Sequence, residues 1–301
     1  MLPILSPTEG IQVKPAWFKI RPPKVEIYQH VRETLRERNL VTVCEEAHCP
    51  NMSECWSGGT ATFMVMGGIC TRGCKFCAIG TGKVGEALDL DEPKKLSEAI
   101  GILKLKYAVI TSVDRDDLPD GGAAHFAECI RQVKADHPEL LVEVLIPDFQ
   151  GKIEDLEKVV DAAPNVIAHN VETIDRLQKK VRDLRANYKQ SFSVLRNIKK
   201  LNPKIYSKTA LMLGLGETEV EVIACMKELR AADVDILTLG QYLKPKNKYL
   251  KVEEYVTPEQ FDRFKKIGED MGFLYLAAGP FIRSSYRAAD LFLANISQKN
   301  V

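Results

Sequence analysis

Residues 67–77 read Gly67-Gly68-Ile69-Cys70-Thr71-Arg72-Gly73-Cys74-Lys75-Phe76-Cys77, directly after an apolar run of strand length at 60–66. Three cysteines spaced C-x3-C-x2-C can bind three irons of a four-iron, four-sulfur cluster and leave the fourth iron open to a small molecule. In parallel α/β folds, functional groups gather in loops at the carboxyl ends of strands, and glycines let such a loop wrap closely around its ligand. The stretch therefore predicts a strand that runs into a metal-binding loop.

The chain around this stretch alternates between apolar runs of strand length and segments with helical periodicity. The predicted strands are 60–66, 107–112, 140–147, 165–170, 205–213 and 236–241, and the predicted helices between them are 93–106, 122–136, 153–162, 174–200 (broken) and 219–231. Repeated strand–helix units predict a parallel sheet with right-handed crossovers. Six units fall short of a closed eight-stranded barrel, so we expect an α/β fold built as a partial (β/α)6 TIM-type barrel. An open doubly wound sheet is the alternative.

Three parts follow from this pattern. We expect an N-terminal extension at 1–59, the barrel at 60–272 and a C-terminal extension at 273–301. The N-terminal extension contains a short amphipathic segment at 25–40 and a second cysteine group. A helix at 258–271 precedes a last strand at 273–277, and Arg283-Ser284-Ser285-Tyr286 follows it.

Composition narrows the class of protein. The chain has 301 residues, 45% hydrophobic and 28% charged, with a net charge of +1, so no strong field favours nucleic acid or a membrane surface. No apolar run approaches the ~20 residues that span a bilayer, and residues 1–10 show no secretory signal or transit peptide. We expect a cytoplasmic protein, or one of the mitochondrial matrix in a eukaryote. Its cysteines are then ligands or catalysts rather than disulfides.

The metal that Cys70, Cys74 and Cys77 would bind follows from their number and spacing. A structural zinc site normally has four ligands, often as two C-x2-C pairs, whereas this loop has one such pair. An iron–sulfur cluster is therefore favoured over zinc or unliganded thiols.

A second triplet lies upstream, with the spacing Cys44-x4-Cys49-x5-Cys55. Its spacing alone leaves two interpretations open. It could form a structural metal site that anchors the N-terminal extension, or it could bind a second cluster.

The C-x3-C-x2-C loop resembles the signature of the radical S-adenosylmethionine (SAM) superfamily. The resemblance implies that Cys70, Cys74 and Cys77 hold a 4Fe-4S cluster whose open iron binds SAM. Reductive cleavage of SAM then gives a 5′-deoxyadenosyl radical that can take hydrogen from an unactivated C–H bond.

A closer resemblance covers the chain from about Lys14 to Ala288. TVCEEAHCPNMSECW at 42–56, GGICTRGCKFCAIGTG at 67–82 and the RSSY ending at 283–286 resemble the lipoyl synthase family, as do residues 111–118, 169–173, 208–217 and 240–243. The family implies insertion of two sulfur atoms at carbons 6 and 8 of a protein-bound octanoyl-lysine.

The resemblance also implies a source for that sulfur. An auxiliary 4Fe-4S cluster would be held by Cys44, Cys49, Cys55 and a serine of the RSSY ending, and it would donate sulfide. We assign Ser285 as this ligand and as a catalytic residue, with Ser284 as the alternative. A hydroxyl is a hard ligand that must deprotonate to bind, so it would release its iron easily.

Five further residues are assigned to SAM by resemblance. They are Thr111, Ser112, Asn170, Glu172 and Arg185. A carboxylate at the end of a strand could accept from the ribose or the ammonium group, and the arginine could pair with the carboxylate of SAM.

The implied partners are octanoylated lipoyl carrier domains, such as the glycine-cleavage H protein or the acyltransferase of a 2-oxo acid dehydrogenase complex, and an electron donor such as ferredoxin or flavodoxin. Neither nucleic acid nor a membrane is expected. The chain departs from the family at Lys244-Pro245-Lys246, where Gln-Pro-Ser/Thr is usual. This change adds positive charge where an acidic carrier domain could dock.

Two other functions compete with this interpretation. One is a different radical SAM enzyme whose second cluster is only structural. The other is an iron–sulfur protein that carries electrons or clusters, although the four-cysteine spacing of ferredoxins is absent from the sequence.

Overall fold

The computed structural model describes residues 15, 17, 23–58 and 61–286. Most of the predicted N-terminal lead, the predicted strand start at residue 60 and the matched positions beyond Tyr286 lie outside the described residues. Within them, one curved sheet has the strand order β1-β2-β5-β6-β7-β8-β9-β10. These strands are β1 (Val41–Thr42), β2 (Thr62–Val65), β5 (Tyr107–Ser112), β6 (Leu141–Leu145), β7 (Val166–Ala168), β8 (Tyr206–Leu213), β9 (Ile236–Gln241) and β10 (Tyr275–Gly279).

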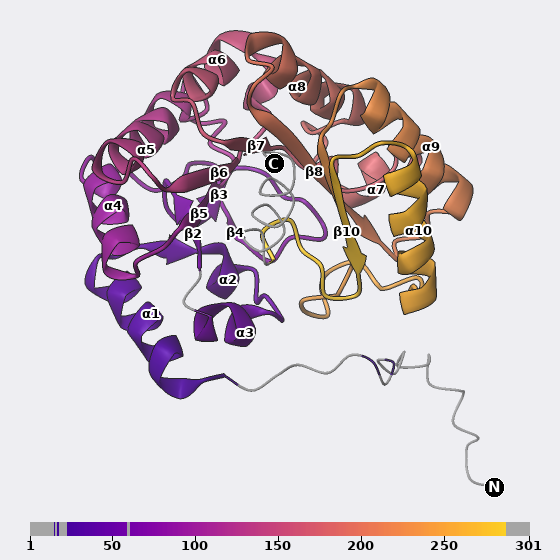
Figure 1. The fold of residues 1–301 in the computed structure, drawn as a ribbon, viewed down its shortest axis with the longest axis horizontal. Helices are drawn as coiled ribbons and strands as arrows, with labels where there is room; N and C mark the ends of the chain where they lie inside the picture. The colour runs from indigo at the N-terminus through magenta and orange to yellow at the C-terminus, as the bar shows by residue number, and fades with distance from the viewer. Residues whose placement is uncertain (1–14, 16, 18–22, 59–60, 287–301) are drawn as a thin grey trace, which may run out of the picture.

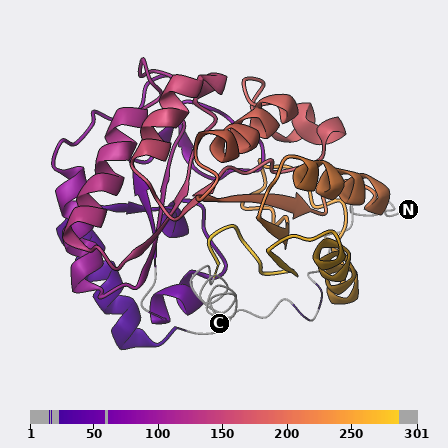
Figure 2. The same ribbon diagram turned by 45° about the horizontal axis from the view of Figure 1, so that its top comes forward.

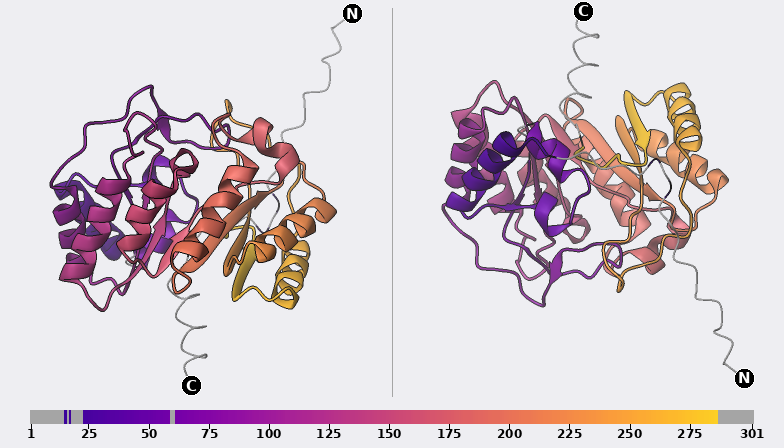
Figure 3. Two further views of the ribbon diagram at one scale, coloured as in Figure 1. Left: turned by 90° about the horizontal axis from the view of Figure 1, so that it is seen from above. Right: turned by 90° about the horizontal axis from the view of Figure 1, so that it is seen from below.

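The helices form a ring outside this sheet (Figure 1). Figures 2 and 3 show the strands on the inner side of the helices. The longer helices are α1 (Val25–Glu37), α4 (Glu92–Ile102), α5 (Ala123–Asp136), α6 (Ile153–Asp161), α8 (Tyr188–Leu201), α9 (Glu219–Ala231) and α10 (Pro258–Asp270). Because the helices cover one side of the curved sheet, the fold is the partial barrel rather than the doubly wound alternative.

Short elements complete the described structure. They are α2 (Val43–Glu46), α3 (Met52–Ser57), α7 (Gln178–Val181), the 3-10 turns η1 (Phe149–Gly151) and η2 (Asp175–Leu177), and the separate strand pair β3 (Ile69–Cys70) and β4 (Gly80–Thr81). The helix predicted as broken at 174–200 is divided among η2, α7 and α8. Among the described residues, no helix is long and apolar enough to cross a membrane.

The sheet contains one more parallel strand than the sequence predicted for the barrel. Strands β2 and β5 to β9 correspond to the six predicted strands, and β10 pairs in parallel with β9 along Tyr275–Gly279. Strand β1 pairs antiparallel with β2. The sheet therefore continues beyond residue 272, and its two edges are β1 and β10.

Local sequence explains where several helices begin. Thr218 and Glu221 form a capping box at the start of α9, which begins at the predicted residue. Gly122 has a φ of 82°, a left-handed conformation that favours glycine, so α5 begins one residue later than predicted.

A buried polar cluster links three strands of the sheet in the amino-terminal halves of β5, β6 and β8. Lys208 Nζ on β8 lies 2.6 Å from Glu143 Oε1 on β6, and Tyr107 on β5 donates its hydroxyl to Glu143 Oε2 at 2.5 Å. All three side chains are buried. These bonds connect β5, β6 and β8 through buried polar side chains.

Candidate active site

The C-x3-C-x2-C cysteines lie in a loop that starts at β3. Cys70 is the last residue of β3, which pairs with β4, and the loop between these strands carries Cys74 and Cys77. Burial raises the pKa of all three thiols, to about 12 for Cys70, 11 for Cys74 and 12 for Cys77. The charge of Cys74 adds to the pKa shift at Cys70 and Cys77, so the three thiols lie near one another. Three neighbouring soft donors in one loop fit the ligand set of an iron–sulfur cluster.

A buried arginine fixes this loop to the barrel. The side chain of Arg72 is 2% exposed, and its guanidinium donates to Asp116 at 2.8 Å and to Asp148 through two bonds of 2.7 Å. Thr71 donates from its backbone N–H and its hydroxyl to the carbonyl of Asp114, each at 2.9 Å. The loop is therefore bound to segments that follow β5 and β6.

The connection between α7 and α8 covers the other side of the loop. The backbone N–H of Asp183 donates to Cys74 Sγ at 3.3 Å, and the carboxylate of Asp183 accepts from Gly73 N–H at 2.8 Å. Arg185 donates to the carbonyl of Thr71 at 2.6 Å and pairs with Asp183 at 2.9 Å. Arg185 thus contacts the cysteine loop, although its side chain is half exposed and already paired.

The other residues assigned to SAM gather at the carboxyl ends of β5 and β7. Thr111 is buried and donates its hydroxyl to the carbonyl of Leu145 at 3.0 Å. Burial raises the pKa of Glu172, while the charge of Arg182 and a hydrogen bond from Asn170 lower it. Glu172 also has a φ of 70°, a strained conformation of the kind often found at functional sites.

Two buried polar atoms at this rim have unused hydrogen-bonding capacity. Ser112 Oγ and Asn170 Oδ1 are buried and have no hydrogen-bond partner among the described residues. Buried polar atoms are normally satisfied, so two such atoms at the carboxyl ends of β5 and β7 fit a polar ligand such as SAM.

The first cysteine triplet lies on two short helices that periodicity could not reveal. Cys44 lies in α2, Cys55 in α3 and Cys49 between them. Burial raises the pKa of Cys44 to about 11, and the charge of Cys49 adds to the shift. Helix α3 packs on α1 through Trp56 and Tyr28, whose ring centroids are 4.9 Å apart. The exposed His48, which lies beside Cys49, contacts the carbonyl of Glu45.

The RSSY segment lies against this first triplet. Asn51 donates its side-chain amide to the carbonyl of Phe281 at 2.7 Å, and Tyr286 donates its hydroxyl to Glu54 at 3.1 Å. Burial raises the pKa of Cys49, while the backbone of Asn51 and the positive charge of Arg283 lower it. The fold therefore brings the two sequence motifs together from opposite ends of the chain.

Comparisons with known proteins show the family to which the chain belongs. Residues 64–229 match the radical SAM superfamily. The chain is 53% identical to lipoyl synthase of Marinobacter nauticus, with 96% of the chain and 84% of that protein covered. It is 55% identical to lipoyl synthase of Anaeromyxobacter sp., covering 93% and 95%, and 52% identical to the mitochondrial lipoyl synthase of Homo sapiens, covering 95% and 78%.

The chain belongs to the lipoyl synthase family. It is therefore a sulfur-inserting enzyme of the radical SAM superfamily that uses 4Fe-4S clusters and SAM. Among solved structures, methylornithine synthase has a TM-score of 0.54 at 13% identity, covering 83% of this chain and 71% of that one. The hydrogenase maturase HydG of Carboxydothermus hydrogenoformans has a TM-score of 0.54 at 14% identity, covering 91% and 78%. At these identities the structures support the fold alone.

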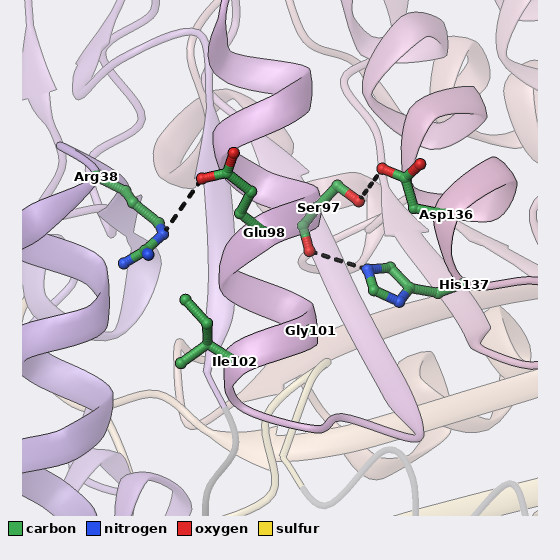
Figure 4. Close-up of a pocket in the computed structure, with 7 residues that line it drawn as sticks. All are labelled: Arg38, Ser97, Glu98, Gly101, Ile102, Asp136 and His137. Carbon is green, nitrogen blue, oxygen red and sulfur yellow. Dashed lines mark hydrogen bonds and ion pairs between the residues drawn. The ribbon is translucent and has the colours of Figure 1, made fainter.

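A pocket of about 460 Å³ lies elsewhere, between α1, α4 and α5 (Figure 4). Its polar groups bind one another: Ser97 donates its hydroxyl to Asp136 at 2.6 Å, and His137 lies 2.9 Å from the carbonyl of Ser97. None of the predicted lipoyl synthase residues lines it, so we do not assign it to the active site.

Sequence reasoning missed the residues that hold the cysteine loop in place. Arg72 and Asp183 were not assigned a role, because their partners lie far away in sequence: Asp148 is 76 residues from Arg72, and Cys74 is 109 residues from Asp183. No local signal distinguishes such residues from solvated ones. Cys129 and Cys225 are buried in α5 and α9, where they are part of the hydrophobic core.

Proposed function

We propose that this lipoyl synthase family member inserts sulfur at carbons 6 and 8 of an octanoyl-lysine on a lipoyl carrier domain, with its auxiliary cluster as the sulfur source. The observation that carries this proposal is the contact between the RSSY segment and the first cysteine triplet, through Tyr286 and Glu54. A serine ligand to a second cluster requires this proximity.

The proposal assigns each cysteine triplet one cluster. Cys70, Cys74 and Cys77 would hold the cluster that, when bound, supplies one electron to cleave SAM for hydrogen abstraction. Arg72 fixes the loop that presents these thiols, since its guanidinium is bound on two sides. Ser112 and Asn170 would direct their unused oxygens toward polar groups of SAM.

Further residues would complete the SAM site. Glu172 and Arg185 carry opposite charges beside the cysteine loop, so they would bind the ammonium or ribose and the carboxylate of SAM, respectively. For Arg185 this requires exchange of part of its pairing with Asp183. Thr111 would shape the wall through its bond to Leu145.

Cys44, Cys49 and Cys55 would hold the auxiliary cluster with Ser285 as the fourth ligand. A serine oxygen beside three thiolates is the weakest donor of the set, so the iron that it holds is the one most easily released. Arg283, whose charge already reaches Cys49, would favour the deprotonated serine. Ser284 is the alternative ligand.

Replacement of single ligands tests these assignments. Anaerobic Ser285→Ala protein is expected to cleave SAM and to make no lipoyl product, whereas Ser284→Ala, the matched control, keeps the product. Cys74→Ala is expected to abolish SAM cleavage and to halve the iron content. Full lipoyl product from Ser285→Ala would exclude this serine as the ligand, and full product from both serine variants would show that neither serine alone is required for sulfur insertion.

The proposal also includes the specific protein partners and the cellular compartment. Support for lipoyl carrier proteins as substrates comes from the lipoyl synthases that this chain resembles. We assign the glycine-cleavage H protein or a 2-oxo acid dehydrogenase acyltransferase as carrier, and ferredoxin or flavodoxin as electron donor. The extensions 1–59 and 273–301 would supply the auxiliary site around the barrel at 60–272. The cytoplasm, or the mitochondrial matrix in a eukaryote, is the expected compartment.

A further inference from the structure

Positive charge is concentrated in one surface loop. Residues 243–251 read LKPKNKYLK, with four lysines and no acidic residue, whereas the whole chain has a net charge of only +1. We call residues 243–251 the lysine loop. Lys244, Lys246, Lys248 and Lys251 are all exposed. The loop therefore carries a local excess of positive charge.

The lysine loop lies at the rim that holds the SAM site. It begins two residues after the end of β9, at the carboxyl side of the sheet. The backbone N–H of Leu250 points to the carbonyl of Lys75 at 3.4 Å, and Lys75 lies between Cys74 and Cys77. Lys75 is also exposed, so it extends the positive surface from the lysine loop to the cysteine loop.

The backbone of the lysine loop is anchored at its base. Tyr242, which is 2% exposed, donates its hydroxyl to the carbonyl of Leu250 at 2.8 Å. The N–H of Tyr249 bonds to the carbonyl of Lys246 at 3.1 Å. The lysines are therefore presented from a fixed position, which lowers the cost of ordering the loop on binding.

Most lysines of the loop form no ion pair with a carboxylate among the described residues. Lys251 pairs with Glu253 at 3.0 Å, a carboxylate that Lys180 also reaches at 3.1 Å. Among the described residues, no carboxylate lies within ion-pair distance of Lys244, Lys246 or Lys248. Exposed unpaired cations steer an anionic partner toward the adjacent site.

We propose that the lysine loop, with Lys75, is the docking surface for an acidic carrier domain that presents its acylated lysine to the SAM site. This inference rests on the proposed function. It adds two points to that function: which surface of the enzyme binds the carrier domain, and that this carrier domain must be acidic. Lysines act here as point charges at the rim, so they affect the rate of encounter and its salt dependence more than the chemical step.

Charge reversal in the holoenzyme tests the docking surface. The variant Lys244→Glu/Lys246→Glu/Lys248→Glu is compared with Lys94→Glu/Lys106→Glu/Lys227→Glu, which makes the same charge change at three exposed lysines elsewhere. The substrates are an octanoylated H protein and a short octanoyl-lysine peptide. We expect the lysine-loop variant to raise KM for the H protein by roughly tenfold at low salt, with a smaller effect at 0.5 M salt. Turnover of the peptide and kcat for the H protein stay unchanged, and the control variant behaves as wild type.

The outcomes separate the two proposals. If wild-type enzyme makes no thiolated product from either substrate, the proposed function fails. If wild type is active and the lysine-loop variant keeps its KM for the H protein, the docking surface is wrong. Equal losses on the H protein and the peptide, or equal effects of both charge-reversed variants, also overturn it.

Discussion

Tyr286 donates its hydroxyl to Glu54 Oε1 at 3.1 Å, across 232 residues of sequence. This bond joins the RSSY segment to α3, the helix that carries Cys55. Since Ser285 precedes Tyr286 directly, the bond limits where its hydroxyl can lie. The RSSY segment and the first cysteine triplet, which we propose to form the auxiliary site, are therefore connected by a contact between distant parts of the chain.

Loss of this bond is expected to loosen the auxiliary cluster. In Tyr286→Phe, Glu54 loses a hydrogen bond worth about 1 kcal/mol, because both groups are partly exposed. Iron should then pass to a chelator about fivefold faster, with SAM cleavage retained. Tyr249→Phe, which alters an unrelated tyrosine, serves as the control. Equal iron release from the two variants would contradict the link between Tyr286 and the cluster.

The hydrogen bonds of Arg72 to Asp116 and Asp148 give a prediction about stability. In Arg72→Lys, the ammonium cannot reproduce the bidentate bonds to Asp116 and Asp148, and Asp148 is left buried beside an incomplete partner. We expect the free energy of unfolding of the apoprotein to fall by about 2–4 kcal/mol in urea titrations. Arg131→Lys, at an exposed pair with Glu128, should change it by less than about 0.5 kcal/mol. Similar losses for both variants would show that the bonds of Arg72 contribute little to the free energy of unfolding.

The sequence predicted most strands at their observed positions. It did not predict the bonds from Arg72 to Asp116 and Asp148. Buried parallel strands read as apolar runs, so Tyr107–Ser112 and Ile236–Gln241 appear at the predicted residues. Helices α2 and α3 have four and six residues, too few for a periodic pattern. The charged residues at 114–117 give no sign in the sequence that Arg115 is buried or that Asp116 binds Arg72. Such pairs depend on the fold, which brings distant segments together.

Gly214 is a second example of a feature whose cause the sequence alone does not reveal. The turn at Gly214 could have been a close approach to adenine or a simple tight turn. A Cβ there would lie 2.2 Å from Gln241 Nε2 and 2.3 Å from the carbonyl of Glu254, at a φ of 93°. The protein's own groups therefore require this glycine. The sequence alone could not distinguish the two, because Gln241 and Glu254 are distant in the chain.

His169 predicts a pH dependence of stability. Its Nδ1 lies 3.0 Å from the carbonyl of Ile146, and Ser191, which accepts from Arg182, is 2.9 Å from Nε2. Burial, with the charge of Arg182, lowers the pKa of His169 to about 4 from 6.5. Between pH 6.5 and 4 the unfolded chain protonates this histidine and the folded protein does not. The contribution of neutral His169 to the free energy of unfolding is therefore complete above pH 6.5 and is lost as the pH falls toward 4. It amounts to about 3 kcal/mol.

Comparison with a variant isolates this contribution. Burial raises the pKa of Asp114 to about 6, so Asp114 acts with the opposite sign between pH 3.8 and 6. The free energy of unfolding of the apoprotein is therefore measured at pH 4.5 and 7 for wild type and His169→Gln. The loss on acidification should be smaller in His169→Gln. The same pH dependence in both proteins would exclude His169 as the titrating group, and the exposed His48→Gln serves as the control.

Glu92 supports the strained residue that precedes the cysteine loop. Met66, with a φ of 68°, donates its N–H to both oxygens of Glu92 at 2.9 and 3.1 Å, and Arg115 donates to its carbonyl at 3.2 Å. In Glu92→Ala, the buried N–H of Met66 loses its acceptor, so the free energy of unfolding should fall by about 1–3 kcal/mol. Iron bound by the cysteine loop should also be released faster, because Met66 lies in the segment that leads from β2 into that loop. Glu98→Ala, at an exposed position on the same helix, should change neither property. If Glu92→Ala behaves like Glu98→Ala in urea unfolding and in iron release, the support of Met66 by Glu92 has no role in holding the cluster.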